Sequence, residues 1–367
     1  MTFGLVKAII RIMKIAVLVS GGVDSSVVLA LLKAQGHEVV AFYLKIWLED
    51  ELAFLGECPW EEDLSYVQKL CTQLDVPLQI VSMQQQYHDK VVAYTINEIK
   101  AGRTPNPDIF CNSWIKFGAF YDVITTQFVN ENFDKVATGH YAQVVQQGNL
   151  FLLKMAPDHI KDQTYFLARL TQAQLAKAWF PIGEFNKKQV RQLAHEFNLP
   201  TKDRKDSQGI CFLGKLKFTE FVKHHLGEKL GDLVEYETGR KIGNHQGFWF
   251  YTIGQRQGLG LSGGPWYVVA KDISKNIIYI SKAYFDEGKE RDTFEVANCH
   301  WITNIEPDNL NLKVKIRHGA QQYNCVIKKL GHDTWQVVLA ERDQGIAAGQ
   351  YAVFYDNDIC LGAAMIV

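Results

Sequence analysis

The stretch that decides the fold is residues 14–26, KIAVLVSGGVDSS. Its first six residues are a short apolar run, which predicts a buried strand. Two glycines follow where the chain must turn, and VVLALLKAQ after them has the composition of a helix that ends at Gly36. A glycine-rich loop between a strand and a helix binds anions, because backbone N–H groups and the positive end of the helix dipole point at the same spot.

The alternation of strand and helix continues along the first half of the chain. We predict strands at 37–47, 77–83 and 135–142, and helices at 60–74, 87–100, 112–129, 170–180 and 186–199. Such alternation implies a parallel sheet covered by helices on both faces. The first domain is therefore expected to be doubly wound α/β, with its ligand at the carboxyl ends of the strands.

The character of the sequence changes from about residue 232. Glycine-rich turns separate short alternating runs, namely FWFYTI, PWYVVA, NIIYIS, LKVKIR, NCVIKKL, TWQVVLA and YAVFYD. Runs of this kind predict antiparallel sheet or small barrels. We expect three domains: an α/β catalytic domain at 1–215, a small mainly-β central domain at 216–288 and a C-terminal β-barrel at 289–367.

Composition fits a globular protein with more than one core. The chain has 367 residues, of which 47% are hydrophobic and 22% charged, and a net charge of −1 that gives no overall attraction to nucleic acid. Seven scattered cysteines without a CxxC pair argue against a disulfide scaffold or a four-cysteine zinc site, so no metal-binding residues are assigned. No apolar run approaches the roughly 20 residues of a membrane span, and the first residues lack a signal-peptide cleavage pattern. A cytoplasmic protein without membrane contact is expected.

The loop SGGVDSS differs from the GxxxxGK[ST] loop of ordinary NTPases, because no lysine follows its glycines. It resembles the pyrophosphate-binding loop of the ATP-pyrophosphatase (PP-loop) superfamily, whose members cleave ATP between its α and β phosphates and activate a carbonyl oxygen as an adenylate. That resemblance implies that Asp24 helps to hold the Mg²⁺ of ATP. The alternative is a plain turn with an Asp/Ser helix cap.

Two cysteines lie in segments that favour a reactive thiolate. Cys111 ends the stiff loop GRTPNPDIFC, and we expect Asn112 to open a helix whose dipole lowers the pKa of the thiol. Cys211 lies in KDSQGICFLG, downstream of three cations, Lys202, Arg204 and Lys205. The other cysteines are interpreted as small buried hydrophobes: Cys58, Cys71, Cys299, Cys325 and Cys360.

Several motifs in the same order, from residue 14 to the C-terminal region, resemble the tRNA-specific 2-thiouridylase family. They are SGGVDSS, AGRTPNPDIFCN with IKFG, ATGHYA, KDQTYFL, KDSQGICFLG, TIGQRQGLG, PWYVV and AAGQYAVFY with CLGAA. The resemblance implies an ATP site made of Leu18, Val19, Ser20, Gly21, Gly22, Val23, Asp24, Ser25, Leu44 and Gly139. It implies a flipped-out target base beside Asn106, Pro107 and Asp108, and further tRNA contacts at His140, Lys161, Asp162, Gln163, Arg317, His318 and Gln350.

The resemblance also implies a mechanism. ATP adenylates O2 of the wobble uridine in the tRNA anticodon loop, a persulfide on Cys211 delivers sulfur, and Cys111 completes the transfer, leaving a Cys111–Cys211 disulfide. Asp108 would act as general acid/base. The sulfur comes from a donor protein, either a sulfur-relay protein or a cysteine desulfurase. Asp108, Cys111 and Cys211 could alternatively hold an iron–sulfur cluster, since clusters take thiolate ligands.

Basic and aromatic residues in the second half of the chain suggest where RNA, rather than DNA, would lie. Lys313, Lys315 and Arg317 alternate along one predicted strand and should share a face, with Arg256 and Trp266 nearby. Two rival functions remain: a PP-loop enzyme that amidates a small carbonyl substrate, and a non-catalytic RNA-binding protein.

Overall fold

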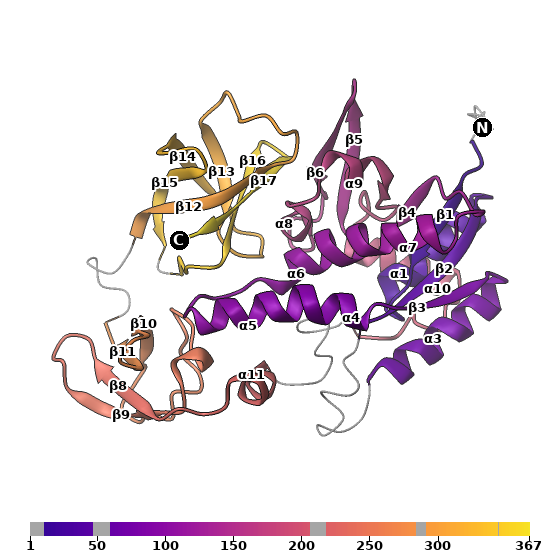
Figure 1. The fold of residues 1–367 in the computed structure, drawn as a ribbon. Coiled ribbons are helices and arrows are strands. Elements are labelled where there is room, and N and C mark those ends of the chain that lie inside the picture. The colour runs from indigo at the N-terminus through magenta and orange to yellow at the C-terminus, as the bar shows by residue number, and fades with distance from the viewer. Residues whose placement is uncertain (1–10, 47–58, 206–217, 284–290, 344) are drawn as a thin grey trace.

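The computed structural model describes residues 11–46, 59–205, 218–283, 291–343 and 345–367. An α/β domain, a small central β domain and a C-terminal barrel follow one another along the chain (Figure 1). The predicted fold class is therefore confirmed. Within the described ranges, no helix is long and apolar enough to cross a membrane.

The α/β domain is built on a five-stranded parallel sheet in the order β3-β2-β1-β4-β7. Its strands are β1 (Lys14–Leu18), β2 (Glu38–Lys45), β3 (Leu78–Ser82), β4 (Lys135–Ala137) and β7 (Ala178–Trp179). Side chains of β1 alternate between two cores, because Ala16 and Leu18 join one hydrophobic cluster while Ile15 and Val17 join the other. Helices cover both faces: α1 (Val23–Ala34), α3 (Pro59–Leu74) and α10 (Lys187–Glu196) pack on the face of Ile15 and Val17, and α5 (Ala93–Lys100) and α7 (Phe120–Thr126) pack on the face of Ala16 and Leu18.

Two predicted helices have different bounds in the structure. Helix α9 (Gln172–Lys177) stops before residues 178–180, because Ala178 and Trp179 pair with β4 as the edge strand of the sheet. The helix expected from residue 112 begins at Pro107 and runs through α6 (Pro107–Phe110), η3 (Cys111–Ala119) and α7 (Phe120–Thr126). Asn106 caps it, since its side chain accepts a hydrogen bond from the Ile109 N–H. The prediction that Asn112 opens this helix is wrong.

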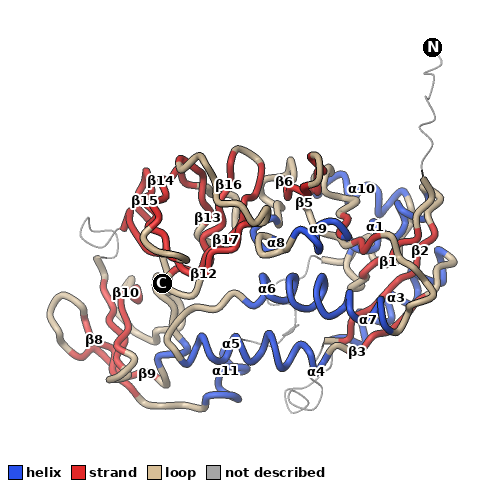
Figure 2. The backbone as a smooth tube through the Cα atoms, turned by 45° about the horizontal axis from the view of Figure 1, so that its top comes forward, coloured by secondary structure: helices blue, strands red, loops and turns tan. Residues whose placement is uncertain are grey.

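The C-terminal domain is a closed barrel of six strands. Strands β12 (Arg291–Trp301), β15 (Thr334–Asp343), β14 (Tyr323–Lys329), β13 (Asn311–Lys315), β16 (Tyr351–Asp356) and β17 (Ile359–Ile366) pair in that order, and β12 also pairs with β17. A hairpin of the α/β domain, β5 (Ala142–Gln147) and β6 (Leu150–Met155), joins the same sheet through β6 and β17. Figures 1 and 2 show this hairpin beside the barrel, so backbone hydrogen bonds connect the first and last domains.

The central domain contains α11 (Phe218–Leu226) and a four-stranded sheet. Strands β10 (Tyr267–Asp272), β11 (Ile277–Ser281), β8 (Gly231–Glu235) and β9 (Lys241–His245) lie in that order. The run FWFYTI is not a strand but begins with the 3-10 turn η4 (Phe248–Phe250), because Gly247 before it has φ +141° and Phe248 turns into the small core. Trp266 belongs to this core and is 6% exposed, so it does not form the predicted RNA-stacking surface.

Candidate functional site

The glycine-rich loop between β1 and α1 is preformed. Gly21 has φ +73°, and a Cβ at this position would lie 2.7 Å from the carbonyl oxygen of Asp63, so only glycine fits. The Ser20 N–H donates to Ser25 Oγ at 3.2 Å, and Ser26 Oγ donates to the Gly22 carbonyl at 2.8 Å. Both hydrogen bonds join residues of the loop to residues of the first turn of α1, so the loop is fixed relative to the helix.

The residues expected around ATP gather at one edge of the sheet. Leu18 ends β1, and Leu44 lies next to the end of β2. Gly139 follows β4, and a Cβ there would lie 2.8 Å from the backbone nitrogen of Ser25. The chain after β4 thus touches the start of α1, and this edge is where parallel α/β sheets place their ligands.

Asp24, in the first turn of α1, has two partners from distant parts of the chain. Lys187 Nζ lies 2.8 and 2.9 Å from its two carboxylate oxygens, and the Tyr141 hydroxyl donates to it at 2.9 Å. Nothing local in the sequence predicted Lys187, which is the first residue of α10. The carboxylate of Asp24 and the hydroxyls of Ser20 and Ser25 are oxygen donors of the type that Mg²⁺ prefers, so these residues fit the expected ion.

Arg204 contacts the glycine loop from a distant part of the chain. Its Nη1 donates to the Gly21 carbonyl at 2.6 Å, its Nη2 lies 2.9 Å from Asp63, and its guanidinium lies over the ring of Tyr66 at 4.3 Å. Cys211 itself lies outside the described residues, as does Cys58.

Cys111 lies one turn inside its helix and is 1% exposed. Asn112 therefore does not open a helix next to this thiol, as was predicted, since the helix begins at Pro107. Asn106 is 9% exposed, and its Nδ2 donates to the Tyr165 hydroxyl at 3.4 Å. Asp108 is half-buried in the first turn of this helix. The cap and first five residues of the helix therefore contain Asn106, Pro107, Asp108 and Cys111.

All three domains meet at residues 102–106, which we call the junction loop. Lys271 of the central domain donates from Nζ to the Gly102 carbonyl at 3.3 Å. From the C-terminal domain, Gln350 Nε2 donates to the carbonyls of Thr104 and Pro105, and the Thr104 N–H donates to Ala348 O at 2.8 Å. The loop that leads into Asp108 and Cys111 is thus held from both sides.

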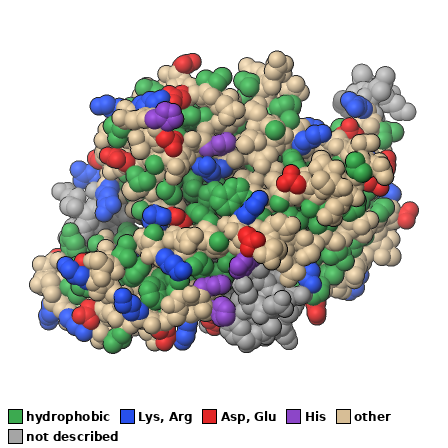
Figure 3. Space-filling model, in the orientation of Figure 1, with side chains coloured by type: hydrophobic (Ala, Val, Ile, Leu, Met, Phe, Trp, Pro, Cys, Tyr) green, Lys and Arg blue, Asp and Glu red, His purple; other side chains and the backbone are tan. Residues whose placement is uncertain are grey.

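An aromatic group next to Cys111 was not predicted from the sequence. The rings of Phe110 and Trp114 stack with their centroids 3.9 Å apart, and the Arg169 guanidinium lies 5.8 Å from Phe110 and 5.6 Å from Tyr351. Phe110 and Tyr351 are buried, while Trp114 is half-buried. Figure 3 shows hydrophobic side chains gathered at the centre of the face where barrel and α/β domain meet, with Lys and Arg side chains around them.

Three of the expected tRNA contacts in the first domain have internal partners. His140 is 8% exposed, lies 2.6 Å from Thr138 Oγ1, and has a pKa well below 6.5 because of burial and, secondarily, Lys116. Asp162 is 1% exposed and accepts hydrogen bonds from Thr164 and Lys315. Gln163 accepts one from the Tyr141 N–H at 3.0 Å. Lys161 is half-buried, and its backbone N–H donates to Asp158 Oδ1 at 3.2 Å.

The predicted basic face of β13 is interrupted. Lys313 and Arg317 are exposed, but Lys315 is 0% exposed and paired with Asp162 at 2.8 Å, so the prediction that the three share a solvent-facing row is wrong for Lys315. Arg317 forms a two-pronged ion pair with Asp343 at 3.0 and 2.6 Å. His318 is an exposed residue whose ring packs on Phe166 with centroids 4.4 Å apart, and partial desolvation, followed by the charge of Lys315, lowers the pKa of His318.

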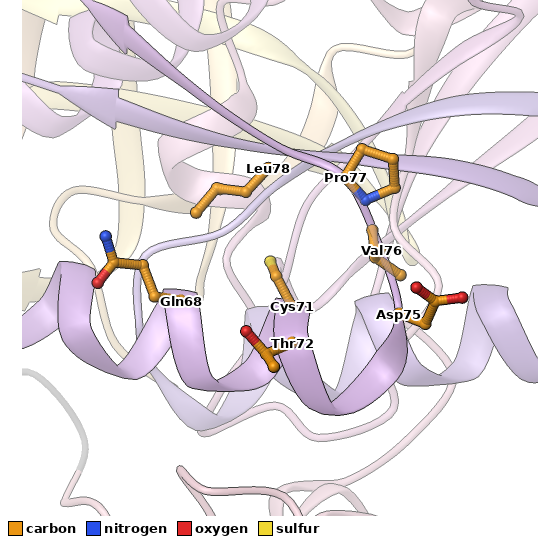
Figure 4. Close-up of a pocket in the computed structure, with 7 residues that line it drawn as sticks. All are labelled: Gln68, Cys71, Thr72, Asp75, Val76, Pro77 and Leu78. Carbon is orange, nitrogen blue, oxygen red and sulfur yellow. The ribbon is translucent and has the colours of Figure 1, made fainter.

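Three of the four other described cysteines fit the interpretation as small buried hydrophobes, whereas Cys299 is only half-buried. Cys71, Cys325 and Cys360 are buried, and burial raises the pKa of Cys71 to about 11. Cys71 lines a cavity of about 460 Å³ between α3 and β3 (Figure 4). Cys71 and Cys111 belong to the hydrophobic clusters on opposite faces of the parallel sheet. Within the described part of the chain, no three His, Cys, Asp or Glu residues gather closely enough to hold a metal ion.

Comparison with known proteins places these features in a family. Residues 13–215 match the model of the tRNA methyl transferase HUP domain, 219–282 that of the tRNA methyl transferase PRC-barrel domain, and 291–366 that of the aminomethyltransferase beta-barrel domain. The parallel sheet with its glycine loop, followed by two β domains, therefore defines a three-domain protein of the HUP class.

Curated relatives show to which family within this class the chain belongs. The tRNA-specific 2-thiouridylase MnmA of Parabacteroides distasonis is 44% identical over 97% of this chain and 99% of its own length. Proteins of the same name from Bacteroides thetaiotaomicron and Porphyromonas gingivalis are 44% and 43% identical, each over 96% of this chain and 99% of their own. The chain belongs to the tRNA-specific 2-thiouridylase family.

Proposed function

We propose that this protein is a tRNA-specific 2-thiouridylase, an ATP-dependent sulfurtransferase that replaces O2 of the wobble uridine with sulfur. One observation carries the proposal: near-complete alignment with 2-thiouridylases, in a chain whose glycine loop and Cys111 segment both belong to the first domain. We assign the catalytic domain to residues 1–215, the central domain to 216–288 and the barrel to 289–367.

The family descriptions disagree about the reaction, since two of the domain models carry the words tRNA methyl transferase. We favour thiolation for a chemical reason. Methyl transfer does not require cleavage of ATP between its α and β phosphates, the reaction that a pyrophosphate-type loop serves, whereas conversion of C=O into C=S requires both an activated oxygen and a sulfur nucleophile.

The ATP site is proposed at the edge formed by residues 18–25, Leu44 and Gly139. The first N–H groups of α1 would receive the phosphates. Asp24 would hold Mg²⁺, which supplies charge neutralisation on the phosphates. The uracil O2 attacks the α-phosphate, the bond between the α and β phosphates breaks, and pyrophosphate leaves.

Sulfur transfer is proposed to involve Cys211 and Cys111. The terminal sulfur of a Cys211 persulfide bonds to C2 and AMP leaves with the former carbonyl oxygen. The Cys111 thiolate then attacks Cys211 Sγ, which breaks the S–S bond and leaves C=S on the base. The two electrons gained by the transferred sulfur come from the two cysteines, which end as a disulfide that a reductant must reopen. Asp108 is proposed to move protons at the uracil.

The substrate is proposed to be tRNA, with the flipped base beside Asn106, Pro107 and Asp108. Arg317, His318, Lys161 and Gln350 lie on surfaces or loops from which RNA could be contacted, while His140, Asp162 and Gln163 would act by shaping the site. A persulfide donor, either a relay protein or a cysteine desulfurase, must load Cys211. The reducing cytoplasm is the compartment we propose.

The decisive experiment is incubation with ATP, a persulfide donor and unmodified tRNA, followed by mass spectrometry of nucleosides. We expect 2-thiouridine together with AMP and pyrophosphate. ATP consumption without thiolated uridine would refute the proposal. Product that persists in both Cys111→Ser and Cys211→Ser would favour an amidating enzyme, and absence of ATP cleavage would favour a non-catalytic RNA-binding protein.

A further inference from the structure

The carboxylate of Asp24 lies where the negatively charged phosphates of ATP are expected to bind. Asp24 places a carboxylate in the first turn of α1, beside the N–H groups that would receive ATP, and like charges repel at such distances. Ordinary NTPase loops carry a lysine that offsets the phosphate charge, but the segment SGGVDSS has none. Any protein cation that acts there in addition to Mg²⁺ must therefore come from elsewhere in the chain.

Resting on the proposed function, we propose that Lys187 is a nucleotide-binding residue whose ammonium neutralises Asp24 in the free protein and contacts the β- and γ-phosphates of bound ATP. Its Nζ lies 2.8 and 2.9 Å from the two oxygens of Asp24. The Lys187 side chain is 15% exposed and that of Asp24 30%, so the pair lies at the mouth of the loop and not in the core.

The backbone of Lys187 is fixed while its side chain can turn. Asn186 and Gln189 form a reciprocal capping box at the start of α10, and the Lys187 N–H donates to Asp158 Oδ2 at 3.0 Å. The flexible four-carbon stem allows the ammonium to move from Asp24 to a neighbouring phosphate oxygen without backbone movement. The Tyr141 hydroxyl, at 2.9 Å, stays as a partner of Asp24 after such a move.

The next residue provides a matched control. Lys188 has the same charge and lies on the same helix, but it is exposed and forms no part of the Asp24 group. Lys187→Gln and Lys188→Gln therefore change the net charge equally, and of the two only Lys187→Gln removes the cation that contacts Asp24.

The test is calorimetric binding of ATP and of AMP to the full-length protein, in MgCl₂ and in EDTA. In Lys187→Gln we expect the Kd for ATP to rise at least tenfold and the Kd for AMP, which lacks the β- and γ-phosphates, to change less than twofold. Lys188→Gln should leave both constants unchanged. Equal weakening of ATP and AMP would reduce Lys187 to a structural partner of Asp24, and unchanged ATP binding would also overturn the proposal.

A second pair of variants keeps the test independent of the folding of Lys187→Gln. Asp24→Asn removes the carboxylate that holds the ammonium, so in EDTA it should bind ATP at least as tightly as wild type, and adding Lys187→Gln should weaken it at least tenfold. Equal Kd values for the single and double variants would contradict the role of Lys187. If wild type binds ATP as described but forms no thiolated tRNA, the proposed function fails while the role of Lys187 stands.

Discussion

Gln350 Nε2 on the C-terminal domain donates hydrogen bonds to the carbonyl oxygens of Thr104 and Pro105, at 3.2 and 3.3 Å. A side chain near the end of the sequence thus holds the junction loop that leads into Asp108 and Cys111. Family resemblance had suggested Gln350 as a tRNA contact. In this structure its amide nitrogen is engaged with the protein, so its influence on RNA would pass through the loop.

We predict that Gln350→Glu is more harmful than Gln350→Ala. Alanine loses two hydrogen bonds of about 1 kcal/mol each, whereas glutamate also places a negative acceptor against two carbonyl oxygens. Urea unfolding should rank the variants in the order wild type, Ala, Glu, and kcat for thiolation should fall in the same order. Gln79→Glu, an exposed amide on β3, is the control and should have little effect. Equal stability of the Ala and Glu variants would contradict this reading.

The buried pair between Lys315 and Asp162 gives a second prediction. Both side chains are 0% exposed, and Thr164 Oγ1 donates a further hydrogen bond to Asp162. Lys315→Met should lower the free energy of unfolding by about 3–5 kcal/mol, because it leaves a buried carboxylate without its cation. The double variant with Asp162→Asn should recover part of that loss. A double variant that is as unstable as the sum of the single ones would argue against direct coupling.

The free energy of unfolding should depend on pH through the titration of Lys271. Burial lowers the pKa of Lys271 from 10.5 to about 8. The folded protein therefore binds fewer protons than the unfolded chain between about pH 8 and pH 10.5, so the contribution of Lys271 to stability rises with pH across that window. Relative to Lys271→Met, wild type should gain roughly 1–2 kcal/mol between pH 7.5 and 9.5. A stability difference that stays constant over this range would show that the amine titrates normally.

Cys71 and Cys325, which lie outside the proposed site, serve as controls for the proposed sulfur chemistry. Burial raises the pKa of Cys71 to about 11 and that of Cys325 to about 12, so neither is a thiolate at neutral pH. Cys71→Ala and Cys325→Ala should retain 2-thiouridine formation within a few-fold, whereas Cys111→Ser and Cys211→Ser should abolish it. Nucleoside mass spectrometry measures the product, and melting temperatures show that each variant is folded. Loss of product in folded Cys71→Ala would reassign the sulfur chemistry.

Arg317 should contribute to tRNA affinity through its charge. Its side chain is 47% exposed although it is paired with Asp343, so one face of the guanidinium remains accessible to a phosphate. Arg317→Ala should weaken tRNA binding and reduce the slope of log K against log salt by about 1. Arg240→Ala, whose side chain is 71% exposed on the central domain, should change neither quantity. An unaltered salt slope for Arg317→Ala would remove this residue from the interface.

The sequence predicted the strands and turns whose formation depends on neighbouring residues. The apolar run of β1, the glycine turn after it and the alternating runs of the barrel were all found where expected, since hydrophobic periodicity and turn chemistry act over a few residues. The errors arose where tertiary contacts override propensity. Ala178 and Trp179 leave a helical pattern to pair with β4, and Lys315 leaves an alternating basic row to meet Asp162.

The same distinction holds for the site. Gly21, Asp24 and Cys111 could be named from short motifs, but the partners that hold them could not. Lys187 lies 163 residues from Asp24, and Arg204 lies 183 residues from Gly21. Only the folded sheet brings such residues together, because no spacing rule connects them.

The junction loop limits how these domains can be exchanged between relatives. A chimera with a foreign barrel would bring its own residues to positions 348–350, and a foreign central domain its own residue at 271, yet both must fit the backbone at Gly102 and Thr104. Grafts that keep every catalytic side chain could still misplace the target base. Recombination should therefore succeed only when those contacts are transferred as a set.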